Sequence, residues 1–163
     1  MAAANDQPVL SFLGAAKTVT GSRFLVETRA ARVLVDCGLC QERELQSRNW
    51  EPFPVPADRL DAVLLTHAHL DHCGLLPRLA KEGFRGRIHC TGPTAEIAKI
   101  VMLDSARLQA EDVENKKKRH EREGRTSPRP LVPLYSEADA EAAARLFAVV
   151  EPGAIVEVAD GMR

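Results

Sequence analysis

Three of the five histidines of this chain fall within six residues, together with an aspartate. The segment reads His67-Ala-His-Leu-Asp-His72 and follows a continuous apolar run at residues 62–65. Such a run is typical of a strand that is buried on both faces. Core packing does not readily explain four ionisable side chains after a buried strand. Burying such groups costs free energy unless they are paired or bound to a metal. The segment therefore predicts a metal site at the end of a strand.

The spacing of these side chains suits two ions. Alternate residues of an extended chain point to the same side, so His67 and His69 can reach one ion. Asp71 and His72 follow where the chain turns toward a helix expected at 75–82, and they can reach a second ion beside the first. Imidazole and carboxylate are the ligands of zinc sites that keep a position open for water. We expect two Zn²⁺ ions held by His67, His69, Asp71 and His72.

A second carboxylate, Asp36, ends an apolar strand expected at 33–35. In one interpretation it accepts a hydrogen bond from a ligand imidazole or a bound water and so fixes the orientation of that group. In the other interpretation its side chain forms hydrogen bonds with the backbone of the turn at the end of the strand. Asp71 and Asp36 are the two carboxylates that we expect to take part in catalysis.

The remaining histidines and the cysteines have simpler interpretations. His89 has no carboxylate neighbour and is expected to be structural, and His120 lies in a charged segment where solvent exposure is expected. Cys37 and Cys40 form a C-x-x-C pair, for which a redox or metal role is the alternative. No second pair completes a four-thiolate site, so we expect small core residues. Four cysteines without a secretory signal predict reduced thiols and a cytoplasmic protein.

Apolar runs and turns alternate along the chain. Antiparallel pairing is expected between residues 24–26 and 33–35. Further strands are expected at 9–13, 62–65, 88–90 and, near the end, at 155–156. Helices are expected at 75–82, from Pro93 onward and from Ser136 onward. Strands that alternate with helices predict a layered α/β domain.

Two of the expected helices carry a recognisable pattern. The helix after Pro93 has an apolar stripe composed of Ile97, Ile100, Val101, Leu103 and Leu108. In the last helix, Ser136 and Asp139 resemble a capping box, with aspartate in place of glutamate. Its expected buried face is lined by Ala142, Leu146 and Val149.

Charge and composition narrow the classes of partner. The chain has 163 residues, 45% of them hydrophobic and 28% charged, which excludes a wholly disordered chain. Its net charge is −1, so any nucleic-acid contact must be local.

Residues 115–130 hold seven Lys or Arg and two Glu, and a loop or helix extension is expected there. Lys116-Lys-Lys-Arg119, Arg122 and Arg125 form either a solvated face or a phosphate-contacting patch. No apolar run reaches the ~18 residues of a membrane span, so no membrane is expected.

Several stretches together resemble one family. They are Phe12-Leu-Gly-Ala15, Val19-Thr-Gly-Ser22, Leu34-Val-Asp-Cys-Gly38 and Leu64-Leu-Thr-His-Ala-His-Leu-Asp-His72 followed by Gly74. This combination resembles the metallo-β-lactamase superfamily. Residues 14–22 favour its β-CASP branch, which includes RNA-processing nucleases such as the cleavage-and-polyadenylation endonuclease subunit.

The resemblance implies a fold and an activity. The fold is an αββα sandwich with two zinc ions at the edge between its sheets, the first held by His67 and His69 and the second by Asp71 and His72, with Asp36 beside them. The activity is zinc-dependent hydrolysis of RNA phosphodiester bonds, with RNA as the partner and a homodimer of the complete protein as a further expectation. The alternatives are a hydrolase of a small thioester or lactone and a catalytically incompetent fragment.

Residues 1–8 lack the charged and apolar regions of a secretory signal and are expected to be a disordered leader. The resemblance implies that residues 9–163 are a partial metallo-β-lactamase domain. The family's later ligands, which are two histidines and a bridging aspartate, and the β-CASP lobe are not found in the sequence. We therefore expect the chain to be an N-terminal fragment that carries half of the metal site.

Overall fold

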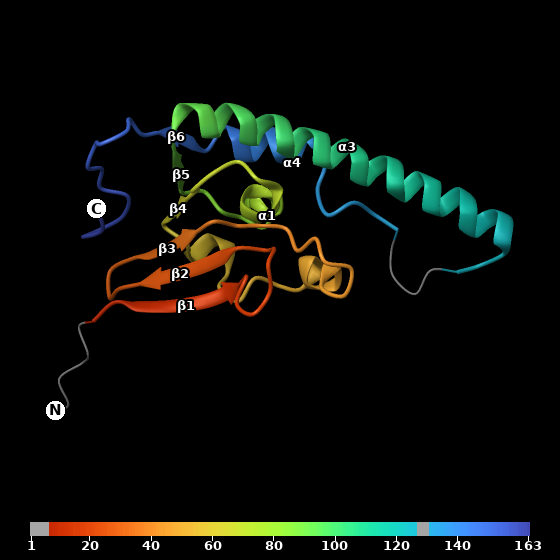
Figure 1. Cartoon of the computed structure of the whole chain (residues 1–163), viewed down its shortest axis with the longest axis horizontal. Coiled ribbons are helices and arrows are strands. Elements are labelled where there is room, and N and C mark those ends of the chain that lie inside the picture. The colour runs from red at the N-terminus through yellow and green to blue at the C-terminus, as the bar shows by residue number, and fades with distance from the viewer. Residues whose placement is uncertain (1–6, 127–130) are drawn as a thin grey trace.

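The short apolar runs pair into one mixed sheet in the computed structural model, which describes residues 7–126 and 131–163 (Figure 1). The strands follow one another in chain order across the sheet. Their bounds are β1 Val9–Gly14, β2 Arg23–Glu27, β3 Arg32–Val35, β4 Ala62–Leu64, β5 Arg87–Cys90 and β6 Phe147–Val149. The β1–β2 and β2–β3 pairs are antiparallel, and the remaining pairs are parallel. The predicted antiparallel pairing of β2 and β3 is thus confirmed.

The parallel strand β4 lies between β3 and β5, near the centre of the sheet. Its residues Ala62 and Val63 are completely buried, as the continuous apolar run predicted. A central parallel strand is buried on both faces, so its sequence does not alternate between apolar and polar residues. The chain leaves β4 and runs directly into the histidine cluster, which therefore starts from one of the best-buried positions in the molecule.

Helices cover the face of the sheet that carries Leu25, Leu34, Val63 and Ile88 (Figure 1). The α-helices are α1 Leu70–Cys73, α2 Leu76–Lys81, α3 Gly92–Glu123 and α4 Glu137–Ala144, and two short 3₁₀ helices are η1 Gln46–Trp50 and η2 Ala57–Arg59. α4 packs against both α2 and α3. The layered α/β class predicted from the sequence is confirmed. No helix of the described residues is long and apolar enough to cross a membrane.

The opposite face of β1 and β2 carries apolar side chains that are only partly covered. Leu10 and Phe12 on β1 are 53% and 64% exposed. Phe12 contacts Phe24 of β2 edge-to-face, with ring centroids 5.6 Å apart. Exposed aromatic and aliphatic side chains side by side on a sheet mark a surface that other protein atoms normally cover.

The expected apolar stripe of α3 is partly wrong. Ile97, Ile100 and Leu108 are more than half exposed, whereas Val101 and Leu103 do pack against the core. The helix instead buries the face composed of Ala98, Met102, Ser105 and Ala106. Small side chains let α3 approach its neighbours closely. Helix periodicity alone does not show which of two adjacent faces makes that contact.

The C-terminal expectations need two corrections. Residues 155–156 form no strand, and Ile155 is 85% exposed. The strand beside β5 is β6 instead, held by the backbone bond from the N–H of Ile88 to the carbonyl oxygen of Leu146 at 2.9 Å. The free edge of β5 can pair with only one strand, and that strand is β6.

The second correction concerns α4, which ends at Ala144 and buries Ala140 and Ala143. The face expected from Ala142, Leu146 and Val149 is therefore wrong, because Leu146 and Val149 lie beyond the helix. The predicted capping box of Ser136 and Asp139 is present. Most of the leader expected at residues 1–8 lies outside the described residues.

Candidate metal centre

The predicted ligand segment brings three imidazole rings together. After β4 the chain is extended through His69 and then enters α1. The ring of His67 lies 4.6 Å from that of His69 and 3.9 Å from that of His72, measured between centroids. Extended geometry thus places the alternate residues His67 and His69 side by side, and the turn into α1 returns His72 to the same place.

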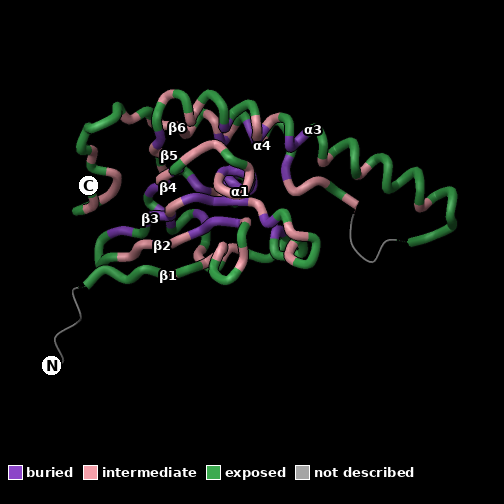
Figure 2. The backbone as a smooth tube through the Cα atoms, in the orientation of Figure 1, coloured by how far each residue is buried: buried purple, intermediate pink, exposed green. Residues whose placement is uncertain are grey.

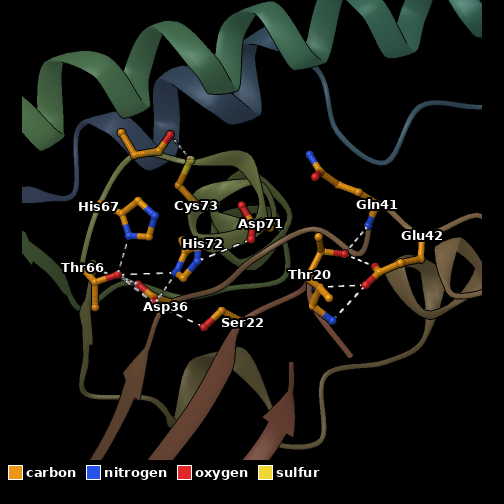
Figure 3. Close-up of polar contacts among 12 residues, drawn as sticks. Thr20, Ser22, Asp36, Gln41, Glu42, Thr66, His67, Asp71, His72 and Cys73 are labelled. Carbon is orange, nitrogen blue, oxygen red and sulfur yellow. Dashed lines mark hydrogen bonds and ion pairs between the residues drawn. The ribbon is translucent and has the colours of Figure 1, made fainter. Parts of the chain in front are cut away.

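His72 lies between two carboxylates (Figure 3). Its Nδ1 is 2.7 Å from Oδ2 of Asp36, and its Nε2 is 3.5 Å from Oδ2 of Asp71. An ionised carboxylate only accepts hydrogen bonds, so the Nδ1 proton of His72 is donated to Asp36. The lone pair on Nε2 then points toward Asp71. A histidine that donates its other ring N–H to a carboxylate is the usual arrangement of a metal ligand.

Asp36 is almost completely buried and is held by two hydroxyl side chains. Thr66 donates its hydroxyl to Asp36 at 2.9 Å from Oδ1 and its backbone N–H at 2.9 Å, and Ser22 donates its hydroxyl at 3.3 Å. Because the Thr66 hydroxyl donates to Asp36, it can accept the Nδ1 proton of His67, which lies 3.0 Å away. Asp36 therefore determines which ring nitrogen stays free in two histidines. It acts directly on His72 and through Thr66 on His67.

Backbone bonds hold α1 against the turn that follows β3. The N–H of Ser22 donates to the carbonyl oxygen of Asp71, and that of Cys37 to the carbonyl oxygen of His72, each at 2.8 Å. Gly38 lies so close to the carbonyl group of Asp71 that a Cβ at this position would collide with it. Glycine is required where two backbone segments approach this closely. The candidate ligands are therefore positioned by main chain from several parts of the sequence.

Burial lowers the pKa of His67 from its ordinary value, and the neighbouring imidazoles of His72 and His69 lower it further. A lowered pKa keeps the imidazole of His67 neutral over a wider pH range. A neutral imidazole is the form that binds a cation, because the lone pair must be free.

The donor chemistry fits a divalent metal, although the ligand set is partial. Within residues 7–126 and 131–163, no group of three or more His, Cys, Asp or Glu side chains is arranged as a metal-binding set. The four expected ligands are neighbours without forming such a set: the carboxylate of Asp71 faces His72, and the rings of His69 and His72 each lie beside that of His67. These nitrogen and oxygen donors suit zinc.

Sequence reasoning assigned no role to three residues near the site. Ser22 and Thr66 stand in the stretches that resemble the family, and their hydroxyl groups next to a buried carboxylate are the signal that could have identified them. Glu42 accepts the N–H groups of Val19 and Thr20, each at 3.0 Å, and the Thr20 hydroxyl. These bonds hold the loop that leads to Ser22 (Figure 3).

The cysteines are buried and unpaired in the described residues. Burial raises the pKa of Cys37 to about 12 and also raises the pKa of Cys40. A thiol with a raised pKa is a poor nucleophile and a poor metal ligand at neutral pH, so the interpretation as core residues holds. His89 is half-buried. His120 is also half-buried, which corrects the expectation that it is solvent-exposed. It lies on α3 rather than in a loop.

Fold and site together agree with one family. Residues 18–153 match the model of the metallo-beta-lactamase superfamily. The match covers most of the chain, so the chain belongs to the metallo-beta-lactamase superfamily. Members of this superfamily generally bind divalent metals, often zinc.

Relatives narrow the assignment within the superfamily. The chain is 47% identical over 98 residues to Ribonuclease TTHA0252 of Thermus thermophilus, an alignment that covers 60% of this chain and 22% of the relative. It is 32% identical over 157 residues to Transcription termination factor FttA of Cenarchaeum symbiosum, covering 94% of this chain and 22% of the relative. Both relatives are RNA-processing members of the β-CASP branch, which confirms the narrower resemblance. The chain spans about a fifth of the length of these two relatives.

Among solved structures, the chain is similar to the metallo-beta-lactamase fold protein YhfI from Bacillus subtilis. The TM-score is 0.39 at 28% sequence identity, and the match covers 53% of this chain and 37% of YhfI.

Proposed function

We propose that this chain carries part of the metal centre of a zinc-dependent hydrolase that cleaves RNA phosphodiester bonds. The observation that carries the proposal is the position of His72 between Asp36 and Asp71, 2.7 Å and 3.5 Å away. Membership of a metal-binding superfamily and relatives named as a ribonuclease and a transcription termination factor support the choice of RNA.

The roles of the side chains follow from their contacts. Asp36 keeps the proton on Nδ1 of His72, so that Nε2 is available to a metal ion. Thr66 does the same for His67. Asp71 offers a carboxylate at the same point, as a ligand and as an acceptor for a proton of the attacking water. When bound, a pair of zinc ions lowers the pKa of that water and neutralises charge that develops on the phosphate.

The ligand set is completed, in this proposal, by residues outside these 163. Two observations support this division. The described residues contain no arranged set of three ligands, and the chain spans about a fifth of the length of the two relatives described above. The partial domain of residues 9–163 would then be one part of a larger metallo-β-lactamase unit.

The activity is tested with the full-length protein and a labelled RNA, with and without a chelator. We expect cleavage that stops with the chelator and returns with added zinc. His69→Ala should lower the rate by at least about 100-fold, in the range found when a group that acts in the transition state is lost. His89→Ala, which removes an imidazole outside the cluster, is the matched control. Cleavage that persists in the chelator, or in His69→Ala, contradicts the proposal.

A catalytically incompetent fragment is the second candidate for the 163-residue chain itself, and the partial ligand set favours it. We expect the isolated chain to bind zinc weakly and with less than two equivalents. Equilibrium dialysis followed by elemental analysis measures this stoichiometry. Two tightly held zinc ions in a monomer would show that the chain completes the site without further residues.

A further inference from the structure

The distal part of α3 extends beyond the rest of the domain (Figure 1). Its last buried residue is Ala106, and every residue from 107 to 123 is exposed or half-buried (Figure 2). A helix that is polar on all sides either bridges to something else or is held by charge pairs along its surface. We call residues 111–123 of this helix the α3 arm.

Charge pairs account for part of the arm and the turn that follows it. Lys116 lies 2.5 Å from Asp112, and Lys117 lies 2.9 Å from Glu114. Arg125, just beyond the helix, lies 3.2 Å from Glu123. The first two pairs, at spacings of four and three residues, stabilise an exposed helix modestly. The pairs therefore support the arm, which has no core beneath it.

Three other cations form no close ion pair in the described part of the chain. Lys118, Arg119 and Arg122 are exposed and take part in no ion pair there. The pKa of Glu114 is lowered by the hydrogen bond and the charge of Lys117, and more weakly by the charge of Lys118. Arg122 is three residues from Arg119 and four from Lys118, so the three side chains share one face of the helix. We call this face the basic stripe. Like charges at these spacings repel one another, and a bound anion relieves that repulsion.

The basic stripe borders a shallow and open surface groove, which is formed by side chains of this one helix. The other side chains at this groove are Asp112, Asn115, Lys116 and Glu121. Cations are in excess, and the carboxylate of Asp112 is already paired with Lys116. The stripe is linear and open, with neighbouring side chains about 5–6 Å apart. Such a surface suits a chain of phosphates better than a single enclosed phosphate, and an arginine can bind a phosphate through two N–H groups.

We infer that the α3 arm binds the phosphate backbone of single-stranded RNA through Lys118, Arg119 and Arg122. This inference rests on the proposed function, because it takes RNA as the polyanion. It selects phosphate contact over a solvated face for Lys118, Arg119 and Arg122. The other three cations of the basic run, Lys116, Lys117 and Arg125, form ion pairs instead.

The test uses the full-length protein in a chelator, so that binding is measured without cleavage. The probe is a short fluorescein-labelled single-stranded RNA, followed by anisotropy over a range of salt concentrations. The test variant is Lys118→Gln/Arg119→Gln/Arg122→Gln. The matched control is Lys116→Gln/Lys117→Gln/Arg125→Gln, which removes the same charge from the ion-paired positions. Glutamine preserves helix propensity, and circular dichroism checks that both variants fold.

We expect the test variant to bind at least about tenfold more weakly and its salt dependence to fall by about 2 in slope, since each phosphate contact to a single strand contributes about 0.7. The control should lose less than half of that slope. Equal losses in both variants would mean a diffuse charge effect and would overturn the inference, as would unchanged binding by the test variant.

The outcome separates this inference from the proposed function. A lower affinity of the test variant supports the basic stripe even if metal-dependent cleavage is not found. Metal-dependent cleavage with unchanged binding by the test variant supports the proposed function and removes the stripe. If the test variant loses as much affinity for labelled poly-glutamate as for RNA, the stripe suits an acidic protein partner, and this result also overturns the inference.

Discussion

Asp36 connects the sheet to the histidines at the level of a single side chain. Its φ of +59° lies in the left-handed region, which few residues other than glycine, asparagine and aspartate adopt. Hydrogen bonds from Thr66, Ser22 and His72 hold it there. Unusual backbone conformations persist where the surrounding structure compensates their cost, and they are common at functional sites.

Asp36→Asn tests this arrangement in the full-length protein. Asparagine tolerates the same backbone conformation but removes the negative charge that holds the Nδ1 proton of His72. We expect zinc affinity to fall about 10- to 100-fold, as for other changes behind a metal ligand, measured by competition with a chromophoric chelator. Asp61→Asn is the control, because Asp61 accepts a bond from the N–H of Arg32 and makes none with the histidines. Unchanged zinc affinity would contradict the role of Asp36.

Glu42 is the second residue whose charge matters. The hydrogen bond from the Thr20 hydroxyl, together with backbone N–H groups, lowers the pKa of Glu42 from 4.5 to about 2. A carboxylate whose pKa is lower in the folded state stabilises the fold above its unfolded pKa. This stabilisation is lost as the pH falls through the folded pKa.

The corresponding variant is Glu42→Gln. One carboxylate oxygen of Glu42 accepts the backbone N–H groups and the other accepts the Thr20 hydroxyl, and an amide has only one accepting oxygen. We expect its unfolding midpoint in urea to lie below that of the wild type at pH 7. The difference should shrink as the pH falls from about 4.5 to about 2, because the wild-type carboxylate becomes protonated there. A difference that does not vary with pH would mean that packing rather than charge is responsible.

At the scale of an element, α4 shows how a local signal positions a helix. The Ser136 hydroxyl accepts the N–H of Asp139 at 3.2 Å, and Asp139 accepts the N–H of Ser136 at 2.8 Å. These bonds satisfy two backbone donors at the start of the helix. α4 packs against α2 and α3, and the chain continues from its end into β6.

Ser136→Ala should lower the free energy of unfolding by about 1 kcal/mol, the usual cost of losing an N-cap side chain. Urea unfolding followed by circular dichroism measures the change. Ser136→Asp keeps a capping oxygen and should stay within a few tenths of a kcal/mol of the wild type. An equal loss in both variants would contradict a capping role.

At the scale of the whole molecule, the partly covered side of β1 and β2 predicts that the 163-residue chain associates in water. Phe12 is 64% exposed beside the ring of Phe24. Val19 is 83% exposed but stands in a loop. Grouped apolar side chains promote association, whereas single ones do not.

Phe12→Gln should therefore reduce binding of the dye anilinonaphthalene sulfonate and reduce light scattering of the 163-residue chain. Its urea midpoint should change little, because the ring of Phe12 is mostly in solvent. Val19→Gln is the control and should alter neither signal. Dye binding that is unchanged in Phe12→Gln would show that this side of the sheet is covered in solution.

Local patterns were sufficient for the first five strands and the capping box. A run such as residues 62–65 needs only its own side chains to show burial on both faces. The order His67, His69, Asp71 and His72 similarly predicts a cluster from its spacing alone. The proposed nucleic-acid contact could be located no further than a basic run, because sequence does not show which cations are already paired.

The sequence by itself determined the layered α/β class and the starting points of most strands and helices, and it predicted four ligands that remain a proposal. Only the tertiary structure decided which face of α3 is buried, that β6 rather than residues 155–156 pairs with β5, and that Asp36 contacts His72 across 36 positions. The physical reason is the distance along the chain over which each interaction acts. Hydrophobic period and capping act within one element, whereas burial and hydrogen-bond partners depend on segments that only folding brings together.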